Sequence, residues 1–149
     1  MTNNAQKACA DAIATVLADT HVLYMKAHNF HWNVEGMRFI ALHEMFEAQY
    51  TDLAEAMDDL AERIRALGEY APGTQAKLSK LASIKENEGQ PSAEDMLRET
   101  VADYETIGQT LTAAITVAQE HGDEPTVGML TDRLEFHEKQ AWMMKSMLK

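Results

Sequence analysis

Four side chains in this sequence are of the types that bind a transition-metal ion. His31 and His43 lie on either side of Gly36, and Asp58 and Glu62 follow farther along the chain, one helical turn apart. Imidazole nitrogens and carboxylate oxygens form a mixed ligand set that suits Fe²⁺, Zn²⁺ or Mn²⁺, and no thiolate is present in the set to favour a structural zinc site. The residue types therefore indicate a metal site and leave the identity of the metal open.

The spacing of apolar residues places these side chains on two long helices. Apolar residues recur at steps of three and four over residues 9–30 and again over residues 42–67, and Gly68 ends the second pattern. In the second helix one arc of about 100° lies apart from the apolar stripe. This arc carries His43, Glu47, Asp58 and Glu62, and its solvent side carries Glu44, Asp52, Glu55 and Asp59.

A single copy of the second helix cannot complete the site. His43 and Asp58 are fifteen residues apart, which is about 22 Å along a helix, whereas metal–ligand bonds are about 2 Å long. If two copies of the helix pack antiparallel around a two-fold axis near Thr51, His43 of one chain comes beside Asp58 and Glu62 of the other. The spacing therefore predicts a site shared between two subunits.

The usual intrachain di-iron pattern is missing from the sequence. In bundles that hold two irons within one chain, a Glu precedes a His by three residues on each of two helices. The residues three positions before the six histidines are Ala18, Met25, His28, Ile40, Ala118 and Leu134.

The rest of the chain predicts two more long helices. Residues 69–89 form a connection that contains Pro72 and a short apolar cluster at Leu78, Leu81 and Ile84, so we expect a small helix there. Ser92 is a candidate N-cap for a helix that ends near His121 and Gly122, and the last helix follows Pro125. The pattern predicts an all-α, ferritin-like four-helix bundle with a short extra helix in the crossover, in a single domain spanning residues 1–149.

Charge and composition exclude several classes of function. The chain has 13 Lys and Arg against 24 Asp and Glu, a formal charge of −11, so cations are better partners than phosphates. No apolar run has the length of a membrane span, and the polar opening MTNNAQKACAD lacks the basic start and apolar run that we expect of a secretory signal. The lone cysteine, Cys9, forms no intrachain disulfide and fits a small buried hydrophobe. We expect a cytoplasmic protein.

Two segments resemble the signature motifs of the Dps family of mini-ferritins. They are HWNVEGMRFIALHEMFE, residues 31–47, and MDDLAERIRALGEYA, residues 57–71. The resemblance implies a hollow dodecamer that oxidises Fe²⁺ at sites across the dimer interface, with hydrogen peroxide as the preferred oxidant. The Fe³⁺ product would be stored inside as mineral, which protects the cell against oxidative damage.

The resemblance also assigns roles to individual residues. It implies that His31 and His43 of one chain and Asp58 and Glu62 of its partner are iron ligands, that Glu47 supports or ligates, and that Trp32 sits against the site. It suggests Asp123 and Asp132 as acidic linings of three-fold pores through which iron enters. If the face formed by Glu44, Asp52, Glu55 and Asp59 lines the cavity, it would gather ferric ions and seed the mineral.

Other interpretations of these residues remain open. Isolated histidines are often hydrogen-bonded structural residues, which is how we interpret His21, His28, His121 and His137. Acidic runs are often solvated surface, Asp123 and Asp132 are also suited to capping a helix, and Trp32 is suited either to packing or to giving an electron.

Two other classes of function compete with iron oxidation. A DNA-compacting protein needs basic surface, yet Lys7 is the only basic residue before Lys26. Twelve copies would carry a formal charge of roughly −132, so we expect no direct DNA binding without bridging divalent cations. A metal-free helical interaction module is the second alternative, and it predicts no metal at the dimer interface.

Overall fold

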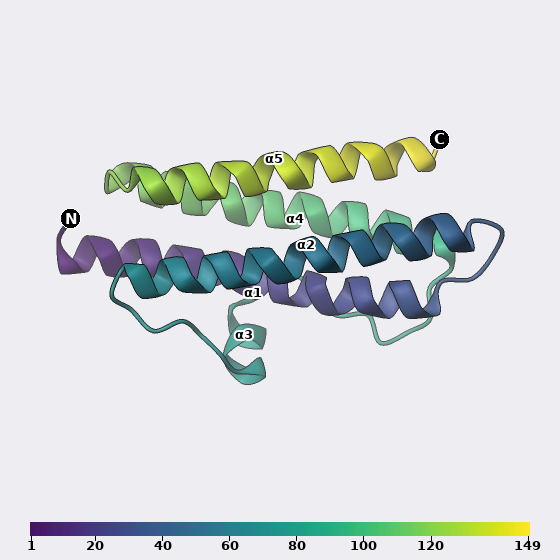
Figure 1. The fold of residues 1–149 in the computed structure, drawn as a ribbon, viewed down its shortest axis with the longest axis horizontal. Coiled ribbons are helices and arrows are strands. Elements are labelled where there is room, and N and C mark those ends of the chain that lie inside the picture. Colours follow the sequence, from purple (N-terminus) through teal and green to yellow (C-terminus); the bar gives the residue numbers. More distant parts are fainter.

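Four long helices and one short helix form the chain, which a computed structural model describes over all 149 residues. Helices α1 and α2 lie side by side and antiparallel, and α4 and α5 form a second antiparallel pair beside them (Figure 1). The ferritin-like four-helix bundle and the short helix in the crossover are therefore confirmed. The helices are α1 (Asn3–Asn33), α2 (Phe39–Ala66), α3 (Gln75–Leu81), α4 (Ala93–Glu120) and α5 (Glu124–Met147).

The ends of the helices follow the capping residues. The Ser92 hydroxyl accepts a hydrogen bond from the Asp95 backbone N–H at 3.1 Å, which confirms the predicted N-cap of α4. Gly68 follows α2 with φ of 95°, a left-handed conformation that residues with a Cβ rarely adopt. Helix α5 begins slightly earlier than predicted, because Asp123 caps it and Pro125 lies within its first turn.

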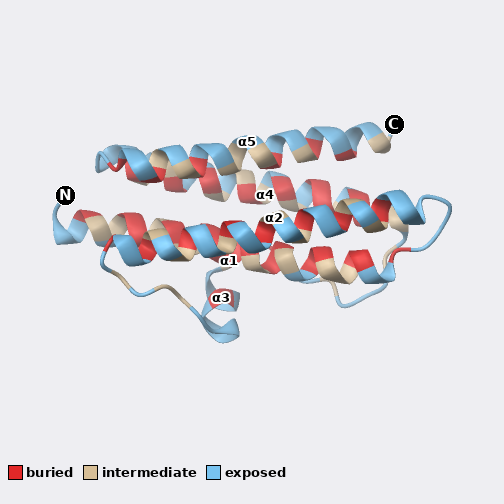
Figure 2. Cartoon of the chain, viewed as in Figure 1, coloured by how far each residue is buried: buried red, intermediate tan, exposed pale blue.

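Apolar side chains on the facing sides of the long helices form one continuous core (Figure 2). Ile13 on α1 and Phe46 on α2 are fully buried, as the helical spacing predicted. Cys9 is also fully buried, which confirms its interpretation as a core residue. None of the helices has both the length and the apolar composition that crossing a membrane requires.

The crossover between α2 and α4 is fixed to α1 by a buried carboxylate. Because α2 and α4 run in the same direction, the connection must travel the length of the bundle (Figure 1). Leu78 and Ile84 of the predicted apolar cluster are buried in the core, whereas Leu81 stays 40% exposed. Asp19 also accepts hydrogen bonds from the backbone N–H groups of Ser83 (2.6 Å) and Ile84 (3.1 Å) and from the Thr110 hydroxyl (2.7 Å).

A buried lysine makes a second attachment about two turns farther along α1. The Lys26 ammonium donates to the Lys85 carbonyl at 2.9 Å and pairs with Glu99 (3.0 Å) and Asp103 (2.6 Å) on α4. Burial raises the pKa of Asp103, and the hydrogen bond from Lys26 opposes that rise. Lys26 therefore joins α1, the crossover and α4 through one charged group.

The interior between α2 and α5 contains an ion pair next to a neutral histidine. Arg133 contacts both oxygens of Asp52, at 3.2 and 2.9 Å, and its guanidinium also lies 3.4 Å from Nε2 of His137. His137 is 1% exposed and packs edge-on against Tyr104. Burial, with a smaller effect from the Arg133 charge, lowers the pKa of His137 to about 3.

We expect His137 to make the folded chain sensitive to acid. Its ordinary pKa is 6.5 and its folded pKa is about 3, so the stability from neutral His137 is complete above pH 6.5. As the pH falls toward 3, the unfolded chain takes up the proton first and stability drops by about 1.4 kcal/mol per pH unit for this one group. Replacing His137 with Phe, which keeps an aromatic ring against Tyr104, should flatten the curve of unfolding free energy against pH by that slope. Parallel curves from urea titrations of the two proteins would contradict this assignment.

Candidate metal site

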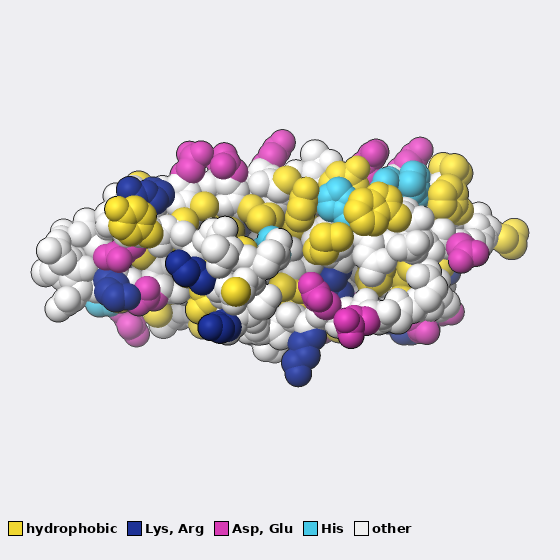
Figure 3. Space-filling view, turned by 90° about the horizontal axis from the view of Figure 1, so that it is seen from below, with side chains coloured by type: hydrophobic (Ala, Val, Ile, Leu, Met, Phe, Trp, Pro, Cys, Tyr) yellow, Lys and Arg dark blue, Asp and Glu magenta, His cyan; other side chains and the backbone are white.

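His31 and His43 are held together by two reciprocal hydrogen bonds. Nδ1 of His31 lies 2.7 Å from the backbone oxygen of His43, and Nδ1 of His43 lies 2.7 Å from the backbone oxygen of His31. The two rings stack with centroids 3.8 Å apart and an interplanar angle of 13°. Figure 3 shows histidines gathered with large hydrophobic side chains toward one end of the molecule.

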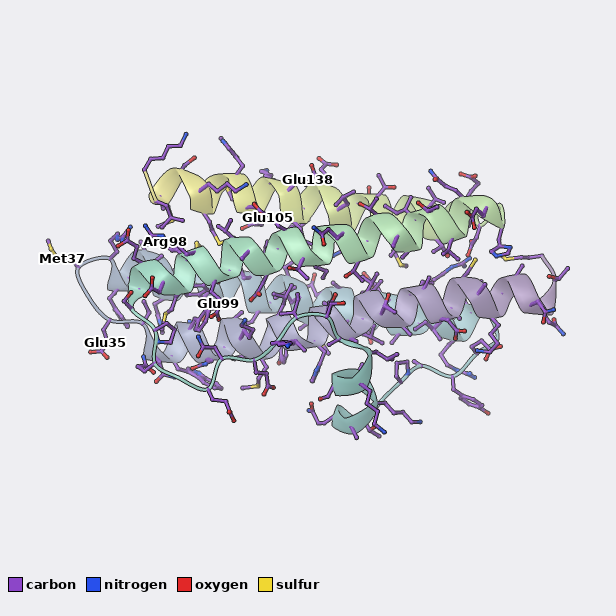
Figure 4. The ribbon with its side chains drawn as sticks, turned by 180° about the vertical axis from the view of Figure 1, so that it is seen from behind. Glu35, Met37, Arg98, Glu99, Glu105 and Glu138 are labelled. Atoms are coloured by element: carbon purple, nitrogen blue, oxygen red, sulfur yellow. The ribbon has the colours of Figure 1, made fainter.

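The end of α1 explains why this pairing forms. The carbonyl of His31 belongs to the last turn of α1, where carbonyls have no helical N–H partner, and no backbone N–H bonds to it. The turn after α1 contains Gly36 at φ of 117°, and Figure 4 shows Glu35 and Met37 at its tip, pointing away from the bundle. This tight reversal brings the first turns of α2 beside the open carbonyl, where the His43 imidazole donates to it.

The reciprocal bonds determine which ring nitrogens are free. A carbonyl oxygen only accepts hydrogen bonds, so Nδ1 of each neutral ring must carry the proton. The lone pair is then on Nε2 of both His31 and His43. Metal-ligating histidines generally donate their other N–H to a carbonyl or carboxylate, and both rings have this arrangement without a metal.

Aromatic residues that the sequence analysis did not single out surround the histidine pair. Phe39 stacks against His43 with centroids 4.9 Å apart, and Tyr50 packs edge-on against His31 at 5.3 Å. His28 stacks on Tyr50 at 3.8 Å, and burial with a smaller effect from His31 lowers the pKa of His28. These residues lie three, four or seven positions from His31 or His43 in the sequence. That spacing places each of them on the same face of its helix as one of the two histidines.

Among the aromatic rings of its own chain, Trp32 contacts His28. It is 59% exposed, and its ring tilts against His28 with centroids 5.1 Å apart. His28 thus lies between the indole and Tyr50 in a row of aromatic contacts.

The candidate carboxylates are exposed on α2, with Asp58 and Glu62 far along the helix from His43 and Glu47 one turn after it. A hydrogen bond with Asp58, and the negative charge of that residue, raise the pKa of Glu62, so the two carboxyl groups form a pair. Glu47 is exposed and accepts a hydrogen bond from the Tyr50 hydroxyl at 3.4 Å. No three His, Cys, Asp or Glu side chains of one chain come together closely enough to hold a metal ion.

Part of the acidic face of α2 lines a shallow hollow of about 460 Å³. Glu44, Glu47, Asp52 and Glu55 border this hollow, whereas Asp59 is exposed outside it. Asp52 differs from the solvated side chain that we expected, because Arg133 binds both of its oxygens and its side chain is only 30% exposed.

Asp123 has a structural role that rules against its assignment to a pore. It is 2% exposed, pairs with Arg63 at 2.6 Å, and caps α5 by accepting from the Thr126 N–H at 3.3 Å. Its second oxygen accepts from the Thr126 hydroxyl at 2.5 Å. The capping alternative is therefore correct for Asp123, whereas Asp132 is exposed on α5 and its assignment to a pore stays a prediction.

Comparison with known proteins identifies the family. A family model described as a ferritin-like domain matches residues 10–149. A protein of Brevibacillus brevis called DNA protection during starvation protein is 40% identical over 149 residues, covering 99% of each chain. The chain belongs to the Dps family of ferritin-like proteins.

Solved Dps structures match the whole bundle. The crystal structure of a Dps protein from Bacillus brevis superposes with a TM-score of 0.96 at 39% identity and covers 100% of both chains. A Dps protein from Vibrio cholerae O1, described as a member of a broad superfamily of ferritin-like diiron-carboxylate proteins, gives a TM-score of 0.96 at 31% identity, covering 100% of this chain and 94% of the other. The Dps resemblance of the two motifs therefore extends over nearly the full length.

We expect the two aspartates near the start of α5 to differ in their effect on stability. Replacing Asp123 with Ala removes an N-cap and leaves the Arg63 guanidinium without its partner, which should cost about 3 kcal/mol. Replacing exposed Asp132 with Ala should change stability by less than about 0.5 kcal/mol. Urea unfolding of both variants measures the difference, and equal stabilities would contradict the structural role of Asp123.

Proposed function

We propose that this Dps-family chain oxidises Fe²⁺ at sites shared between two subunits, prefers hydrogen peroxide as the oxidant, and stores Fe³⁺ mineral inside a hollow dodecamer. The division of the ligands along α2 carries this proposal. At one end of α2, His43 and the neighbouring His31 of α1 have free Nε2 atoms, and the other end carries the Asp58–Glu62 carboxyl pair, yet no group of side chains able to hold a metal forms within the chain.

A two-fold arrangement of two chains accounts for both halves. With the axis near Thr51, the helical turn that carries His43 in one chain lies beside the turns that carry Asp58 and Glu62 in the other. Asp58 also lines a hollow of about 480 Å³ between α1, α2 and residues 72–78. In this arrangement we expect the exposed Trp32 of the chain that supplies the histidines to lie against the shared site.

The ligand set suits a change of iron oxidation state. Imidazole nitrogens hold Fe²⁺ before the reaction, and carboxylates favour the harder Fe³⁺ product. Two Fe²⁺ ions give one electron each to hydrogen peroxide, and two protons complete its conversion to two molecules of water, so no hydroxyl radical is released. In this proposal His31, His43, Asp58 and Glu62 bind iron, and Glu47 supports or joins them.

The acidic hollow on α2 is the proposed place where mineral begins. Because the hollow includes Thr51, a two-fold axis at that residue joins it to the equivalent hollow of the partner. Glu44 and Glu55 of both chains, with exposed Asp59, would then attract ferric ions together. Asp52 contributes less than the sequence suggested, since its charge is already paired with Arg133.

The DNA-compacting alternative has weaker support from this chain. The Brevibacillus relative is named for DNA protection, but the formal charge here is −11. An acidic chain repels phosphates at low salt, so direct DNA contact requires bridging divalent cations.

Mixing two inactive variants tests the shared site. One variant carries His31→Ala and His43→Ala, and the other carries Asp58→Ala and Glu62→Ala. Each alone should assemble but oxidise Fe²⁺ poorly. Unfolded and reassembled together in equal amounts, half of the dimers are mixed and each has one whole site, so the rate of iron oxidation should recover to roughly a quarter of the parent rate.

Two controls make the result decisive. Mass spectrometry of the intact assemblies must show both variants in one particle, and elemental analysis after anaerobic incubation with Fe²⁺ must show bound iron in the parent. Without recovery in such mixed particles, the site lies within one chain. A parent protein that retains no iron is instead the metal-free interaction module.

Iron entry should depend on Asp132. In the assembled protein Asp132→Asn should slow iron uptake at low ionic strength, because it removes a negative charge that attracts Fe²⁺. Asp132→Glu keeps the charge and serves as the matched control. Stopped-flow uptake at the parent rate in the Asn variant would remove Asp132 from the entry path.

A further inference from the structure

The histidine pair is the centre of a stack of four rings. Phe39 lies nearly parallel to His43, with centroids 4.9 Å apart and an angle of 21°, and His43 stacks on His31 at 3.8 Å. Tyr50 closes the opposite end, edge-on to His31 at an angle of 77°. Phe39 is the first residue of α2 and lies one turn before His43.

We propose that Phe39 is a positioning residue for the His43 imidazole. It covers the outer face of that ring and keeps it flat against His31, with Nδ1 directed at the His31 carbonyl. The relevance of this position to iron rests on the proposed function, but the ring geometry is a property of the metal-free chain.

The two histidines differ in how much support they need. His31 is 8% exposed and is enclosed by Tyr50 and by the bundle, so its rotamer is fixed by packing. His43 is only half-buried, and the aromatic rings that contact it are His31 and Phe39. Without Phe39, water reaches the outer face of His43, and the ring gains room to rotate away from the carbonyl that it caps.

Loss of the carbonyl bond would change the chemistry at Nε2. A His43 ring that no longer donates from Nδ1 exchanges between its two neutral tautomers, and in one of them Nε2 carries the proton and cannot bind a metal. Outer partners that orient a ligating histidine typically affect metal affinity by about 10- to 100-fold. Phe39 acts here through packing rather than through a hydrogen bond, so we expect the lower end of that range.

The test compares Phe39→Ala with two matched variants. Ile40→Ala removes a neighbouring apolar side chain that is 63% exposed, and Phe39→Tyr restores an aromatic ring. The first measurement is the ¹⁵N spectrum of histidine-labelled, metal-free protein, well above the ordinary pKa of histidine. The parent, Ile40→Ala and Phe39→Tyr should each show His31 and His43 protonated at Nδ1, whereas Phe39→Ala should show His43 as an average of two tautomers.

The second measurement is the anaerobic affinity for Co²⁺, a spectroscopic probe of the same ligands. Phe39→Ala should bind Co²⁺ roughly tenfold more weakly than the parent, with Phe39→Tyr near the parent value. Because both hydrogen bonds lie within one chain, the ¹⁵N spectrum stays informative even if Phe39→Ala alters assembly. An unchanged His43 signal in Phe39→Ala overturns the proposal. If the His43 signal averages as expected but the parent does not bind Co²⁺, the positioning role stands and the proposed function fails.

Discussion

A straight helix keeps its own residues at fixed separations, and this constraint organises the whole molecule. Along α2, the turn that carries His43 and the turn that carries Asp58 are about 22 Å apart, and no bend of the helix brings them together. Under the proposed function, the chain presents two halves of a metal site, each prepared by local contacts, and only a second copy would supply the missing half.

The free carbonyl at the end of α1 sets the orientation of an imidazole ring. Every helix leaves its last carbonyls without partners, and in this chain one of them is used to orient an imidazole. The reciprocal bond to the His43 carbonyl orients the second imidazole in the same way. The free nitrogens are thus determined by the backbone of two helices, which is more rigid than any pair of side chains.

Regular features of the fold were predictable because they depend on residues close in sequence. The apolar stripes, the Ser92 cap and the Gly68 stop all act within one or two turns. Asp19 and Lys26 were not singled out because polar residues on an inward face carry no signal of their partners, which lie more than fifty residues away.

The candidate site was predictable only in part, for the same reason. The residue types and the two motifs pointed to His31 and His43, whereas the stacking of Phe39 depends on how the turn closes. Asp123 and Asp132 look alike in the sequence, because both are acidic residues near the start of α5. The contact of Asp123 with Arg63 across the bundle distinguishes them.

The Asp52–Arg133 pair has a consequence for how folding relates to metal binding. A bundle that used a metal ion to balance this half-buried carboxylate would depend on that ion for folding. Here a guanidinium that is part of the polypeptide supplies the positive charge. Folding of the subunit therefore needs no metal ion at this position, so under the proposed function a new chain would reach its folded shape before it meets iron.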